Sequence, residues 1–76
     1  MKALNTTELE RNAQIAYNLK RLRAERGMSQ ADLAKSVGIS QSLLAMMETG
    51  ARVMTVPMSI SLANSLGCNV SEIIGE

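Results

Sequence analysis

Apolar residues recur at helical spacing along most of the chain. Three stretches place their apolar side chains three or four positions apart, which puts them on one face of a helix. They are Ile15, Ala16, Leu19 and Leu22, then Leu33, Ala34 and Val37, then Ile60, Leu62, Ala63 and Leu66. The pattern therefore predicts packed helices.

Residues that begin and end helices divide this pattern. Thr7 and Glu10 have the spacing of a capping box and predict the start of the first helix, which Gly27 ends. Ser29, followed by Asp32, predicts a second helix over about 29–37. Gly38 then makes a tight turn to Ser40, which caps a third helix over 40–49.

The remaining residues predict two more helices. Thr55 caps the first of them, and Pro57 is tolerated in its opening turn because the missing N–H has no partner there. Asn69 and Glu72 have capping-box spacing and open a last helix through Ile74. The sequence therefore predicts an all-α fold of five short helices.

The length of 76 residues allows one domain, 1–76, of which we expect residues 1–6 to be flexible. The core must be aliphatic, since Tyr17 is the sole aromatic residue. The first residues lack the apolar stretch of a signal peptide, and the longest apolar run, Leu43 to Met47, is too short to span a bilayer. We therefore expect a cytoplasmic protein with no membrane partner.

The composition excludes most kinds of enzymatic active site. The chain has no histidine and a single cysteine, which excludes histidine-based catalysis and a structural zinc site. We expect no enzymatic activity, no metal and no cofactor, and we expect Cys68 to be a small buried apolar residue. The net charge of +1 gives no global attraction to phosphate, so a nucleic-acid interface has to be local.

Several motifs in order carry a family resemblance. They are Leu19 to Arg23, Gly27 to Ala34, Val37 to Ser42, Glu48 to Gly50 and Leu62 to Gly67. Through them, residues 15–74 resemble the helix-turn-helix of the Cro and cI repressors, the XRE family. The resemblance implies a lambda-repressor-like domain that binds double-stranded DNA as a transcriptional regulator, expected to be a repressor in a bacterial or phage-derived cytoplasm, associated with the nucleoid when bound to DNA.

The resemblance also implies roles for individual residues. The helix over 29–37 would cross the DNA backbone while the helix over 40–49 enters the major groove. Gln30 resembles the glutamine that contacts phosphate and braces the recognition helix. The residues expected to face bases are Gln41, Ser42, Ala45 and Met46; those expected to contact the backbone are Ser29, Gln30, Ser40, Arg52 and Lys20.

Two further expectations concern the orientation of the recognition helix and the dimer surface. Arg23 and Glu48 correspond to a pair that in the family often forms a salt bridge, which would fix the tilt of the recognition helix. Proteins of this kind generally bind two half-sites as dimers. Val70, Ile73 and Ile74 are the expected dimer surface, although they could equally close the core, and the extension before Ile15 is an alternative surface.

The recognition helix departs from the family at its apolar positions. Leu44 and Met47 are expected to face the core, which leaves Leu43, Ala45 and Met46 toward the groove or its rim. Apolar side chains can contact a thymine methyl but supply no hydrogen bond. An alternative is that Leu43, Met46, Val53 and Met54 form an apolar patch for a protein partner, with DNA binding weak or lost. A third is that the methionines fill gaps in the core.

Overall fold

The computed structural model describes residues 6–75, which form five helices and no strand. Their bounds are α1 Thr6–Glu25, α2 Gln30–Val37, α3 Gln41–Thr49, α4 Val56–Leu66 and α5 Val70–Ile74. The predicted all-α fold is confirmed. The segment expected to be flexible lies outside the described residues except for Thr6, the first residue of α1.

The helix boundaries follow the predicted caps with one exception. The side chains of Ser29, Ser40 and Thr55 each accept the backbone N–H of the third residue of their helix. At Asn69 the reciprocal bond is present, with the backbone N–H donating to Glu72 at 2.9 Å. Thr7 is the exception: α1 already includes Thr6, so the cap expected at Thr7 is wrong by at least one residue.

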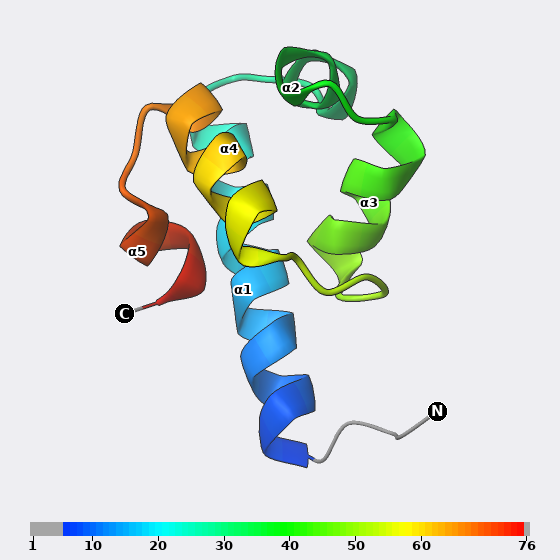
Figure 1. Ribbon diagram of the computed structural model, residues 1–76, viewed down its shortest axis with the longest axis vertical. Coiled ribbons are helices and arrows are strands. Elements are labelled where there is room, and N and C mark those ends of the chain that lie inside the picture. The colour runs from blue at the N-terminus through cyan, green and yellow to red at the C-terminus, as the bar shows by residue number, and fades with distance from the viewer. Residues whose placement is uncertain (1–5, 76) are drawn as a thin grey trace.

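Helix α1 runs along the long axis of the molecule and packs against both α3 and α5 (Figure 1). Helices α2 and α3 form a tight pair, and α4 packs against α2 and α5. A core of aliphatic side chains lies between them: Leu19, Leu22, Leu33, Ala34, Leu44, Met47, Leu62, Ala63, Leu66 and Ile73. All five helices contribute to this core, so the position of α3 depends on the whole bundle.

Two expectations about buried residues need correction. Ile60, expected on the apolar side of α4, is 46% exposed, because Ser59 takes its place beside the correctly predicted Leu62, Ala63 and Leu66 on the inward face of that helix. Cys68 is half-buried against the core rather than fully buried. Burial raises the pKa of the Cys68 thiol, so it stays protonated at neutral pH.

Candidate nucleic-acid interface

Helix α3 has one face in the core and one in solvent. Leu44 and Met47 are buried, as predicted. The opposite face carries Gln41, Ser42 and Met46, which are exposed, and Ala45, which is half-buried. These positions follow i, i+1, i+4 and i+5 spacing and form one continuous stripe. The four residues expected to face bases therefore lie on one side of the helix.

Thr49 continues this stripe by a further turn and was missed from the sequence. It is exposed and lies four residues after Ala45, so the helical periodicity was a sufficient signal. Its hydroxyl donates to the carbonyl of Met46 at 3.1 Å. The exposed face of α3 thus ends in a polar side chain.

The apolar patch expected around α3 is only partly present. Met46 is 40% exposed and Val53 is 58% exposed. Leu43 and Met54 instead pack against the core and are half-buried, so the expectation that they stand free is wrong. Leu43 turns away from the stripe because it lies one position before the buried Leu44 and beside Met47.

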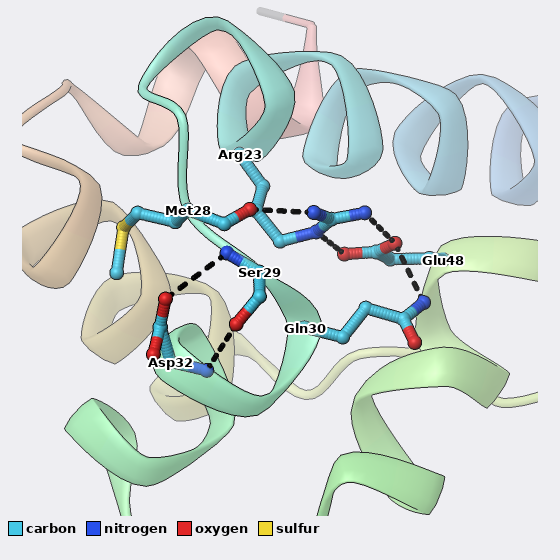
Figure 2. Close-up of polar contacts among 6 residues, drawn as sticks. All are labelled: Arg23, Met28, Ser29, Gln30, Asp32 and Glu48. Atoms are coloured by element: carbon cyan, nitrogen blue, oxygen red, sulfur yellow. Dashed lines mark hydrogen bonds and ion pairs between the residues drawn. The ribbon is translucent and has the colours of Figure 1, made fainter.

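The starts of α2 and α3 present capped helix N-termini. The Ser29 hydroxyl accepts the N–H of Asp32 at 3.0 Å, and the N–H of Ser29 donates to the Asp32 carboxylate at 3.3 Å (Figure 2). The Ser40 hydroxyl accepts the N–H of Leu43 at 3.0 Å. A serine that accepts through its oxygen still has its O–H to donate. Both hydroxyls are exposed, with Asp32 adding negative charge beside Ser29.

A buried carboxylate joins three helices behind this face. Glu48, on α3, accepts from Arg23 of α1 through two bonds, Nε at 2.6 Å and Nη2 at 3.0 Å, which confirms the predicted pair. Gln30 of α2 donates its side-chain N–H to the same carboxylate at 3.1 Å. The Glu48 side chain is only 1% exposed. Figure 2 shows the guanidinium and the amide converging on it.

The guanidinium of Arg23 is further fixed by the backbone. Its Nη1 donates to the carbonyl of Met28 at 2.7 Å, in the segment that leads into α2. The hydrogen bond to Glu48 raises the pKa of Arg23 above its ordinary value. The Arg23 guanidinium therefore stays charged, and Gln30 braces α3 through the Glu48 carboxylate as the family resemblance implies.

The basic side chains fall into two groups. Arg21 pairs with Glu25 at 2.7 Å, and Arg26 donates to the carbonyls of Leu22 and Leu66. Lys20 and Arg52, the two cations expected on the DNA backbone, are exposed, as is Lys35.

The three expected dimer residues, all on α5, differ in burial. Ile73 is 0% exposed and belongs to the core of its own chain, so its assignment to a dimer surface is wrong. The buried amide of Asn18 donates to its carbonyl at 3.0 Å and holds α5 against α1. Val70 and Ile74 are half-buried and pack against the same core.

An apolar groove lies beside the end of α3 and was not predicted. Its volume is about 330 Å³, and it lies between the first half of α1, the segment before α4 and the end of α5. The residues that line it include Arg11, Asn12, Ile15, Val53, Val56 and Ile74. Periodicity marks the residues of a helix face, but it does not show which neighbours leave that face open.

No helix within residues 6–75 has the length and the apolar character needed to cross a membrane.

Comparisons with known proteins agree with this geometry. Residues 19–73 match the helix-turn-helix family HTH_3. Among solved structures, the clp gene regulator ClgR from C. glutamicum is 22% identical with a TM-score of 0.81, over 84% of this chain and 83% of that chain. No match was found among curated proteins.

Two other solved structures are more similar in sequence. The restriction-modification controller protein C.AhdI from Aeromonas hydrophila is 28% identical, with a TM-score of 0.78, over 80% of this chain and 92% of that chain. An HTH_3 family transcriptional regulator from Vibrio cholerae is 29% identical, with a TM-score of 0.82, over 90% of this chain and 38% of that chain. The family match spans α2, α3 and the helices around them, and the XRE resemblance is confirmed: the chain belongs to the helix-turn-helix family HTH_3.

Proposed function

We propose that the chain is a sequence-specific DNA-binding transcriptional regulator that reads the major groove with α3 and acts as a repressor. The observation that carries this proposal is the exposed stripe of α3, which begins with Gln41 and Ser42 and is held in place by the buried Glu48 behind it. The family and the similar transcriptional regulators support it.

Base reading is concentrated at the start of α3. The side-chain amide of Gln41 can accept from adenine N6 and donate to N7, which is worth about 1–3 kcal/mol of discrimination. Ser42 adds a second polar contact, while Ala45 and Met46 suit a thymine methyl. The preferred site should therefore contain adenine and thymine steps opposite this helix.

Contacts with the DNA backbone come from helix N-termini as much as from cationic side chains. The hydroxyls of Ser29 and Ser40 can donate to phosphate, and the first N–H groups of each helix add partial positive charge. Gln30 has a second amide N–H beyond the one given to Glu48. Arg52 and Lys20 complete the proposed contacts with the DNA backbone.

A single α3 reads few base pairs, so we infer that two copies bind half-sites about 34–36 Å apart. Val70 and Ile74 offer only half-buried area, whereas Val53 and Val56 beside the groove are 58% and 72% exposed. The groove therefore suits a second copy better than α5 alone.

The test is selection of bound sequences from random duplex DNA. We expect enrichment of a two-fold-symmetric site. Gln41→Ala should lose preference at one base pair per half-site, by a factor of roughly 5 to 150. Asn64→Ala, which removes an exposed amide from α4, is the matched control and should enrich the same site.

A second candidate function rests on the exposed apolar side chains of Met46, Val53 and Val56. In this case the helix-turn-helix is a scaffold that binds a protein partner, with DNA binding weak or lost. The same selection separates the two: a folded chain that enriches no duplex contradicts the DNA-binding proposal, whereas a non-symmetric site contradicts only the homodimer.

A further inference from the structure

A hydrogen bond ties the first half of α1 to the end of α3. The side-chain Nδ2 of Asn12 donates to the carbonyl of Gly50 at 2.8 Å, across 38 positions of sequence. Gly50 ends α3 in a left-handed conformation, with φ of +84°. The family match begins at residue 19, so Asn12 lies outside the matched helix-turn-helix. The contact therefore joins a residue outside the part of the chain that the family model covers to one inside it.

Asn12 and Arg23 act from the same face of α1. Eleven positions separate them, which is about three turns and about 16 Å of helix, with only about 20° of rotation between them. Both reach the last turn of α3 and the residue that ends it: Arg23 binds Glu48, and Asn12 binds Gly50. One rigid helix therefore holds α3 at two separate points.

Two contacts with α1 restrict the orientation of α3 more than one contact does. Leu44, Met47 and the Glu48 carboxylate hold α3 against the bundle. Any residual swing about Glu48 is felt most at Gln41, which lies seven positions away, about 10 Å along α3. A swing of about 10° would move Gln41 by about 2 Å, more than the whole range of useful hydrogen-bond lengths. A second contact on the far side of Glu48 opposes this swing directly.

We propose that Asn12 is a positioning residue that holds the end of α3 and thereby sets where Gln41 and Ser42 meet the bases. This inference rests on the proposed function, since it gives Asn12 a part in sequence discrimination. Asn12 itself touches no base. Its effect passes through the Gly50 carbonyl and the angle of α3.

The first experiment measures the contact without DNA. Asn12→Asp keeps the shape of the side chain but has no N–H to donate, and Asn12→Ala removes the group. Amide hydrogen exchange is followed at Arg52, whose N–H closes the end of α3 on the Met46 carbonyl at 3.1 Å. We expect both variants to speed exchange there by about 3–10-fold. The control is Gln14→Ala, which removes an amide that donates to Asn18 within α1, and it should leave exchange at Arg52 unchanged.

The second experiment measures discrimination. Anisotropy titrations compare the duplex selected by the wild-type chain with a scrambled duplex, using Asn12→Ala, which adds no charge. We expect affinity for the selected duplex to fall about fivefold and affinity for the scrambled duplex to stay the same. Alanine is a better helix former than asparagine, so α1 itself should persist, which circular dichroism checks.

Three results would overturn the proposal: unchanged exchange at Arg52, faster exchange with unchanged discrimination, or equal losses on both duplexes. If the wild-type chain selects no duplex, the proposed function fails by itself. The exchange experiment then still decides whether Asn12 holds the end of α3.

Discussion

Glu48 joins α3 to both α1 and α2. Its carboxylate is buried, and it is neutralised by Arg23 and bonded by Gln30. A buried ion pair adds little net stability because desolvation offsets most of the attraction, but a buried charge left without its partner is costly. The pair therefore fixes the orientation of α3, and removing only one of its two residues destabilises the fold.

Arg23→Met should destabilise the chain by about 3–5 kcal/mol, because it leaves the Glu48 carboxylate buried with only one amide donor. A chain of this length has about 4–11 kcal/mol of total stability, so this loss removes much of it. Urea unfolding followed by circular dichroism measures the change.

The double variant Arg23→Met with Glu48→Leu separates this cause from general damage. It removes the orphaned charge, so we expect most of the lost stability to return. Arg21→Met is the matched control, since Arg21 pairs with Glu25 in solvent, and it should leave the unfolding midpoint unchanged. A double variant as unstable as the single one would show that the buried charge is not the cause.

At the scale of the helices, local chemistry was predictable, whereas tertiary contacts were predictable only where the family resemblance supplied them, as for Arg23 and Glu48. Ser29, Ser40 and the glycines that follow each helix act on residues within four positions, so their patterns are visible in the sequence. Ile60 was misassigned because periodicity does not show which part of a helix surface its neighbours cover. The Asn12 contact was missed because its partner lies 38 positions away and leaves no local pattern.

The two glycines that bracket α3 give an element-scale prediction. Gly38 and Gly50 have φ of +74° and +84°, where an L side chain is strained. A Cβ at Gly38 meets nothing within 4 Å, so Gly38→Ala should cost only the backbone strain, about 1–2 kcal/mol. A Cβ at Gly50 would lie 3.4 Å from the Asn12 amide, an ordinary van der Waals contact. Gly50→Ala should therefore cost about the same backbone strain as Gly38→Ala.

Urea unfolding of both variants measures the two costs. A Gly50→Ala variant that loses clearly more stability than Gly38→Ala in the wild-type background, but not in an Asn12→Ala background, would show that the Asn12 amide cannot adjust to the added Cβ.

At the scale of the whole molecule, few cations serve the proposed interface. The net charge is +1, and Arg21, Arg23 and Arg26 are engaged by other groups of the chain. Recognition must then depend more on helix N-termini and on shape than on phosphate neutralisation. Such a protein discriminates between DNA sequences by the fit of α3 to the groove, which is consistent with an α3 that is held in place by buried contacts.

Salt titration tests this distribution of charge. Lys20 and Arg52 supply two phosphate contacts per chain in the proposed complex, or four per dimer, and each contact contributes about −0.9 to the slope of log K against log salt. We expect a slope of about −4 for the dimer on its selected duplex. Lys20→Gln should make the slope shallower by about 2, because it removes one contact from each copy, while Lys35→Gln, which removes an exposed cation of α2, should leave the slope unchanged. A wild-type slope steeper than about −6 would show that further cations reach the phosphates and that charge, more than the fit of α3, drives binding.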